Sequence, residues 1–191
     1  MDSRKLIYPE HGNWRANPKV AKVLHRVVCK DTSRYDMQYI QVNSDCLVAT
    51  DGLRLIVFRS EIKIDTGLYF LTQGRWLLPA RITGQYPKWK SIILSPQKKR
   101  VAYKMDNLSD PGQLLWAINR ETDSAMSLEL FLPVTKALLA LNSYDIRLVV
   151  GRKTKTGEPI QIEGKSSYLD HELSFTYVQM PISTANIITE E

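Results

Sequence analysis

Basic residues recur at helical spacing in the N-terminal part of the chain, and no acidic residue lies among them. Lys19, Lys22, Arg26 and Lys30 follow one another at intervals of three or four positions, so a helix would place them on one face. An all-cationic face of this kind favours contact with phosphates, and the most common polyanion partner is nucleic acid. We expect these residues, joined by Arg15, to make phosphate contacts. The alternative is a cationic face that is only solvated.

A second constellation surrounds an arginine in an apolar run. In CLVATDGLRLIVF, from Cys46 to Phe58, the pair Asp51-Gly52 predicts a tight turn between two strands, because glycine accepts a positive φ and aspartate bonds its own backbone. Arg54 follows the turn and is the single charged residue among the apolar residues that come after it. The simplest interpretation of this stretch is strand core and a turn. We expect the Arg54 stem to cover apolar surface while its guanidinium stays in water.

Helical and strand patterns alternate in the segments that carry these residues. Asn17 and Pro18 predict the start of a helix in NPKVAKVLHRVVCKDTS, from Asn17 to Ser33, whose apolar residues recur at intervals of three and four. A second helix is predicted from Pro133, in PVTKALLALNSY. Three β-rich runs follow each helix: MQYIQV, CLVAT and RLIVF after the first, and IRLVV, PIQIE and LSFTYVQM after the second. This repeated α-β-β-β order predicts an α+β fold of antiparallel sheets with the helices on one side.

The stretch between these two halves is basic and harder to assign. From Thr66 to Met105 it holds eight lysine and arginine residues and no acidic residue, which makes it a second candidate for contact with a polyanion. Short apolar runs in and just after it predict further strands: LYFL, WLL, SIIL, GQLLWAI and LELFL.

Bulk composition limits the classes of function. The 191 residues are 43% hydrophobic and carry a net charge of +6, as expected of an ordinary globular protein with a basic surface. Two cysteines make no disulfide framework, and neither a signal peptide nor a membrane helix is visible, so we expect a cytoplasmic protein with no membrane partner. No phosphate loop, metal-ligand spacing or paired carboxylates stand out. We therefore expect a binding protein without catalytic activity, cofactor or metal.

Three separated segments resemble the bacterial sliding clamp, the beta subunit of DNA polymerase III, and occur in the order of that family. They are LVATDGLRLIVF, GQYPKWKSIIL, and GEPIQIEG followed by FTYVQMPI. The resemblance implies one clamp-like domain over 1–191: a first half at 17–59, an enlarged middle at 60–127, a second half at 128–182 and a tail at 183–191. Because 60–127 is too short for the intervening halves of that family, the chain looks like a reduced relative.

The resemblance also implies a peptide-binding site. In the clamps these segments converge on one apolar pocket that receives a short peptide from polymerases and repair proteins. Two positions depart from the family pattern: Leu53 stands where histidine is common, and Ser183 where arginine is common. Carried over by motif, the pocket lining would be Thr50, Gly52, Arg54, Leu55, Pro87, Ile92, Val178, Met180, Pro181 and Ile182.

The implied function is that of a clamp-like accessory protein of DNA replication or repair. It would bind double-stranded DNA, tether a DNA polymerase or another partner with a clamp-binding peptide, and raise processivity. Closing a ring around DNA would require a homo-oligomer of this one-domain chain. Two alternatives stay open: a clamp-fold regulatory module that binds a polymerase or a host clamp without encircling DNA, and an enzyme acting on nucleic acid, such as a nuclease.

Overall fold

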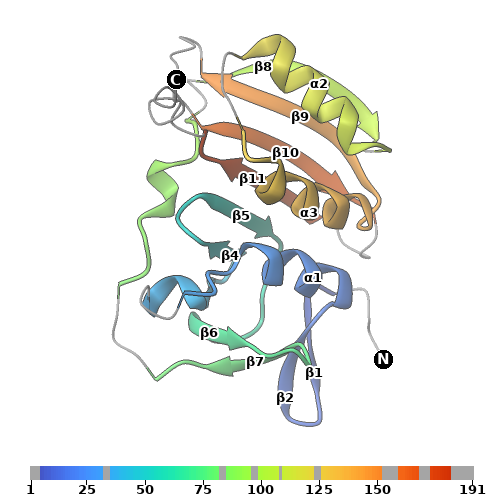
Figure 1. Cartoon of the computed structure of the whole chain (residues 1–191). Coiled ribbons are helices and arrows are strands. Elements are labelled where there is room, and N and C mark those ends of the chain that lie inside the picture. The colour runs from blue at the N-terminus through green and yellow to red at the C-terminus, as the bar shows by residue number, and fades with distance from the viewer. Residues whose placement is uncertain are drawn as a thin grey trace.

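The chain folds as one antiparallel sheet with its helices on one side (Figure 1). The computed structural model describes residues 5–31, 35–81, 85–95, 99–107, 109–122, 126–151, 159–167 and 173–181. Within these ranges there are three α-helices and eleven strands, and every strand pair is antiparallel. The α+β prediction is confirmed. None of the described helices is long and apolar enough to cross a membrane.

The elements have the following bounds. The strands are β1 Ile7–Glu10, β2 Asn13–Ala16, β3 Ile40–Val42, β4 Cys46–Thr50, β5 Arg54–Arg59, β6 Gly67–Leu71, β7 Trp76–Pro79, β8 Lys99–Asn107, β9 Ser143–Gly151, β10 Ile160–Ser166 and β11 Leu173–Gln179. The helices are α1 Pro18–Val27, α2 Pro111–Glu121 and α3 Leu128–Leu139, with short 3-10 turns at Tyr35–Gln38 and Trp89–Ser91.

Two strand triplets, β3-β4-β5 and β9-β10-β11, are arranged symmetrically about one strand pair. The sheet runs β1-β2-β7-β6-β3-β4-β5-β11-β10-β9-β8, so the two strand triplets meet where β5 pairs with β11. Helix α1 precedes the first triplet in sequence and α3 precedes the second. The repeated α-β-β-β order seen in the sequence is therefore present in space, and the β5–β11 pair joins its two halves.

Helix α1 begins where the sequence indicates. The Asn17 side chain accepts a hydrogen bond from the Lys19 backbone N–H at 3.0 Å, and Pro18 occupies the first turn. The helix ends at Val27, six residues before the end of the predicted stretch. Its five buried residues belong to the large core shared by the helices and the sheet: Val20, Ala21, Val23, Leu24 and Val27.

Two predicted strands, GQLLWAI and LELFL, are wrong because both segments are helical. In α2 the Asp110 carboxylate accepts from the Gly112 N–H at 2.9 Å, and the buried residues recur at helical spacing. LELFL forms the first turns of α3, which starts at Leu128 and carries Pro133 in its interior. Pro133 lacks one N–H, and burial of one apolar face of α3 outweighs that loss.

Two other assignments near the sheet also need correction. SIIL is not a strand: Trp89–Ser91 forms a 3-10 turn, and Ile92 and Ile93 pack on the face of the sheet instead of pairing along its edge. Of MQYIQV, only Ile40–Val42 is a strand, because the preceding residues belong to the 3-10 turn Tyr35–Gln38. LYFL and WLL do form β6 and β7 as predicted.

Apolar residues cover both faces of the central strands. The helix-side core contains Ile56 and Phe58 of β5 together with Phe175 and Tyr177 of β11. The opposite face carries a smaller cluster, which we call the outer cluster: Cys46, Val48, Leu55, Val57, Trp89 and Val178. Since successive strand residues point to opposite faces, burial on both sides explains the continuous apolar runs in β4 and β5.

Close packing of Phe175 requires a glycine in the neighbouring strand. A Cβ added at Gly164 would lie 2.5 Å from Ile146 Cδ1 and 2.6 Å from Phe175 Cζ. We predict that Gly164→Ala lowers the free energy of unfolding by about 1–3 kcal/mol, because a rigid ring must move. Urea denaturation measures this, with the half-exposed Ser174→Ala as control. Equal stability of Gly164→Ala and wild type would contradict the packing described.

Candidate functional site

The three motif segments meet at one end of the β5–β11 pair. Leu55 on β5 lies opposite both Thr50 on β4 and Val178 on β11. Just beyond β11, the Met180 N–H donates to the Leu53 carbonyl at 2.8 Å, so the end of the last strand is bonded to the turn that follows β4. Leu53 and Met180, which are more than 120 residues apart in sequence, are thus neighbours.

The middle segment, residues 85–95, crosses the outer face of the sheet as a strap. Trp89 is buried in the outer cluster, and its Nε1 donates to Gln41 Oε1 at 2.8 Å. The Tyr86 hydroxyl donates to the Val48 carbonyl at 3.2 Å. Ile92 packs against the same cluster, and the Pro87 carbonyl accepts from the Trp89 N–H at 2.7 Å. The strap therefore brings Ile92 to the cluster that contains Leu55 and Val178, whereas the Pro87 bond is local to the strap.

The strap also decides which predicted residues are accessible. Leu55 and Val178 are each only 1% exposed, because the chain's own Trp89 and Ile92 cover them. Leu53 and Met180 are 52% and 37% exposed. Gly52 is exposed, Pro181 is half-buried, and Ile182 lies outside the described residues. We call the accessible part the turn patch: Gly52, Leu53, Met180 and Pro181.

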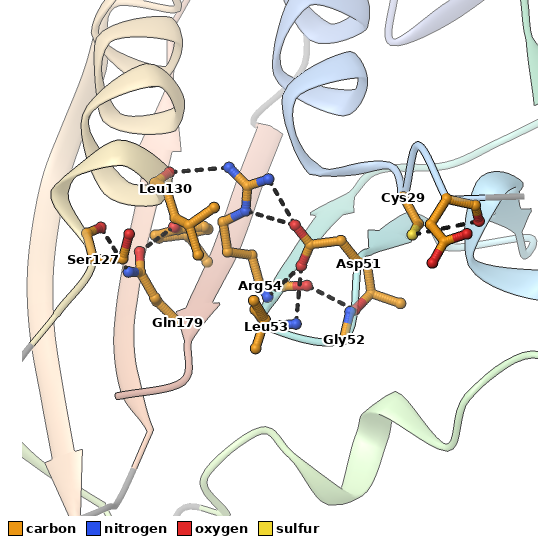
Figure 2. Close-up of polar contacts among 11 residues, drawn as sticks. Cys29, Asp51, Gly52, Leu53, Arg54, Ser127, Leu130 and Gln179 are labelled. Carbon is orange, nitrogen blue, oxygen red and sulfur yellow. Dashed lines mark hydrogen bonds and ion pairs between the residues drawn. The ribbon is translucent and has the colours of Figure 1, made fainter. Parts of the chain in front are cut away.

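Arg54 is held by an ion pair at the turn (Figure 2). Its Nε and Nη2 donate to Asp51 Oδ2 at 2.9 and 2.6 Å, and its Nη1 donates to the Leu130 carbonyl in α3 at 3.0 Å. The side chain is only 10% exposed. The expectation that the Arg54 guanidinium stays in water is wrong, because strand alternation points it toward α3, where a carbonyl and a carboxylate replace the water.

The same carboxylate shapes the turn. Asp51 Oδ1 accepts from the backbone N–H groups of Leu53 and Arg54 at 2.9 and 2.7 Å. The Thr50 hydroxyl donates to the Arg54 carbonyl at 2.6 Å and accepts from the Gly52 N–H at 3.1 Å. Gly52 has a φ of +89°, which residues with a Cβ rarely adopt. The predicted Asp-Gly turn is confirmed, and Asp51 links its backbone to the Arg54 side chain.

A second polar link to α3 was not foreseen from the sequence. Buried Gln179, at the end of β11, donates from Nε2 to the Ser127 carbonyl at 3.1 Å and accepts from the Tyr177 hydroxyl at 2.6 Å (Figure 2). Burial raises the pKa of Tyr177 well above its usual value, so the phenol remains a neutral donor. The sequence did contain a signal for this link. Gln179 follows Phe175 and Tyr177 at alternate strand positions, so it shares their buried face.

A groove of about 390 Å³ runs between the end of α1 and the start of α3, beside the turn. Arg26 and Lys30 line it from the α1 side, Leu53 and Arg54 from the turn, and Glu129 from α3. The groove places two of the predicted DNA-binding residues next to two residues of the turn, so the two predicted sites adjoin.

The predicted DNA-binding residues divide into two groups. Lys22, Arg26 and Lys30 are exposed, and Lys19 is half-buried, on or just beyond α1. Arg15 lies on β2 instead: its guanidinium pairs with Glu10, donates from Nε to the Gly74 carbonyl at 3.2 Å and stacks 4.8 Å from the Trp76 ring centroid. Arg15 thus fastens β1, β2 and β7 together.

The described residues offer little for covalent or metal chemistry. Burial raises the pKa of the Cys46 thiol, which keeps it protonated and poorly nucleophilic. Across the part of the chain that the structure describes, no three histidine, cysteine, aspartate or glutamate side chains gather as a metal site would require. What the site presents is an apolar patch, a buried ion pair and a cationic helix face.

Among known proteins, similarity is found in the fold and not in the sequence. No protein-family model and no curated protein matches the chain. Among solved structures, one that is similar is a DNA polymerase sliding clamp from Bacillus subtilis, with a TM-score of 0.48 and 14% sequence identity. The match covers 86% of this chain and 62% of that clamp, so the chain spans less than two thirds of the clamp's length.

The ion pair at the turn predicts that replacing arginine by lysine changes stability at Arg54 but not at an exposed arginine. Arg54→Lys keeps the charge but loses the planar fork that reaches both Asp51 and the Leu130 carbonyl. It should therefore lower the free energy of unfolding by about 1–3 kcal/mol. Arg26→Lys, at an exposed position on α1, should change it by less than about 0.5 kcal/mol. Urea denaturation of both variants measures this, and an unchanged midpoint for Arg54→Lys would show that the bidentate contact contributes nothing.

Proposed function

We propose that this chain is a non-enzymatic, clamp-like accessory protein of DNA replication or repair, built as one domain over residues 1–191. It binds double-stranded DNA without sequence preference and tethers partner proteins through a peptide site. One observation carries the proposal: three segments with sliding-clamp motifs, far apart in sequence, meet at the end of the β5–β11 pair. The Met180–Leu53 backbone bond and the packing of Ile92 on the outer cluster make that meeting a direct contact.

The peptide arm of the proposal uses the turn patch. Leu53 and Met180 supply exposed apolar surface, and a flexible methionine can adapt to different side chains. Leu55 and Val178 are covered by the strap and support the site from within. Arg54 is a positioning residue because its guanidinium is already bonded to Asp51 and α3. A partner peptide would lay one or two large apolar side chains on this patch.

The DNA arm uses the outer side of α1. Lys22 and Arg26 are exposed, one helical turn apart, and α1 contains no acidic residue. Their positive charges are therefore available to phosphates. Lys19 and Lys30 extend the same face, and Arg15 is left out because it is engaged on β2.

A regulatory module that does not encircle DNA is the second candidate. The two end strands of the described sheet are poorly suited to pairing with another copy: β1 has four residues including Pro9, and β8 has a register shift between Val101 and Tyr103. Light scattering separates the two functions, since a closed ring needs several copies. A monomer that binds peptide but not DNA would favour the regulatory module.

The peptide arm predicts that Met180→Ala weakens binding of a clamp-binding peptide by about tenfold or more, since truncating a hot-spot side chain costs about 2 kcal/mol. Leu78→Ala, an exposed apolar residue on β7, is the matched control and should leave affinity unchanged. Titration calorimetry measures both. Equal affinities for Met180→Ala and wild type, with both folded by thermal melt, would remove Met180 from the site.

The DNA arm predicts that the charge reversals Lys22→Glu and Arg26→Glu together weaken duplex binding equally on any sequence. The slope of the logarithm of the binding constant against the logarithm of salt concentration should also become shallower, by about 0.9 for each phosphate that is no longer neutralised. Lys88→Glu with Lys90→Glu makes the same change in net charge at exposed positions on the strap. Fluorescence anisotropy at several salt concentrations compares the pairs. If the strap pair alone weakens binding, the basic middle of the chain holds the DNA instead of α1.

A further inference from the structure

Helix α2 presents a tryptophan to solvent. Trp116 is 53% exposed, whereas Trp89 is 4% exposed in the outer cluster. The Tyr103 ring of β8 stands edge-on to Trp116, with 6.0 Å between the ring centroids and 72° between the planes. The Arg120 guanidinium lies over the Trp116 ring, 5.1 Å from its centroid. The indole is therefore held from two directions while more than half of its surface remains accessible.

Packing of α2 does not require this ring. The helix is seated by Leu114, Ala117 and Ile118, which are fully buried in the helix-side core. Trp116 lies between these positions in sequence and points away from the core they form. A large aromatic side chain that is ordered but not needed for the core is typical of a binding surface.

The arginine over the indole is linked to a second arginine through one carboxylate. Glu121 lies 3.7 Å from Arg100 on β8 and 3.4 Å from Arg120 on α2, so one carboxylate holds two guanidinium groups. The three charges sum to one net positive charge beside the ring, on a chain whose net charge is +6. The side chains of Arg100 and Arg120 are 41% and 63% exposed, which leaves donors available to a ligand.

We propose that Trp116, Arg100 and Arg120 bind single-stranded nucleic acid. An unpaired base stacks on the accessible surface of Trp116, and the flanking phosphates contact Arg100 and Arg120. Stacking on an aromatic ring next to arginines is sequence-tolerant, because every base has a π-face. Base-paired DNA offers no free base face, so this surface selects single strands. The proposal goes beyond the duplex arm on α1 and stands without it.

The chemistry around the ring favours a nucleic acid over an apolar peptide. The exposed residues of α2 near Trp116 are polar: Gln113, Asn119 and Arg120. A protein hot spot would be expected to set the tryptophan in an apolar surround that excludes water. Here a planar cation and a positive net charge surround it, which matches a base with its phosphates.

The test uses the full chain with a labelled oligothymidine and a labelled duplex, followed by fluorescence anisotropy. Trp116→Ala should weaken oligothymidine binding by about tenfold, the size of one missing base stack, and leave duplex binding within about twofold. Trp116→Phe keeps a ring and should retain most of the affinity. Phe70→Ala, at a 46% exposed aromatic position on β6, is the matched control and should change neither.

Each outcome decides the proposal. The proposal is supported if Trp116→Ala selectively loses affinity for single strands and Trp116→Phe retains it. Unchanged binding in Trp116→Ala overturns it, as does an equal loss for both substrates or no measurable affinity of the wild-type chain for oligothymidine. If Trp116→Ala does not fold, Arg120→Gln replaces it. This variant removes the cation from the ring, and it must show the same selective loss of oligothymidine binding.

Discussion

The pairing of β5 with β11 is the contact on which the rest of the structure depends. Among the described strands, it is the one place where the two halves of the sheet share backbone hydrogen bonds, through the run from Arg54 opposite Gln179 to Arg59 opposite Ser174. Both faces of this pair are buried, by the helices on one side and by the strap on the other. A one-residue slip would exchange the two faces, so the register is strongly determined.

Alternation along that pair also explains the arginine inside an apolar run. Arg54, Ile56 and Phe58 occupy alternate positions on β5, so Arg54 also points to the helix side. There the first turn of α3 offers the Leu130 carbonyl. Leu55 has the opposite parity and lies in the outer cluster. Asp51 supplies the counter-charge from within the same turn. An ion pair that is mostly buried is tolerated here because each guanidinium nitrogen reaches an acceptor.

The two faces of the sheet therefore present different side chains to solvent. The helix side presents α1 with its lysines and arginine, and α2 with Trp116 and Arg120, separated by α3 (Figure 1). On the other side the strap fills the apolar surface around Leu55 and leaves only the turn patch accessible at its end. The cationic side of α1 and the turn patch adjoin at the groove that Arg26, Lys30 and Leu53 line, whereas Trp116 lies on a different helix.

Local sequence patterns determined the start of α1, the Asp51-Gly52 turn and the α-β-β-β order, because capping, positive φ and periodicity act over a few residues. They did not determine that GQLLWAI is helical, since a short apolar run suits a strand or a helix until a partner surface selects one face. Only the tertiary structure decided that Arg54 is buried against α3, that Arg15 is engaged by Glu10 and Trp76, and that Trp89 covers Leu55. Each of these contacts joins residues from separate elements. Their geometry depends on strand register and helix placement, which no single segment specifies.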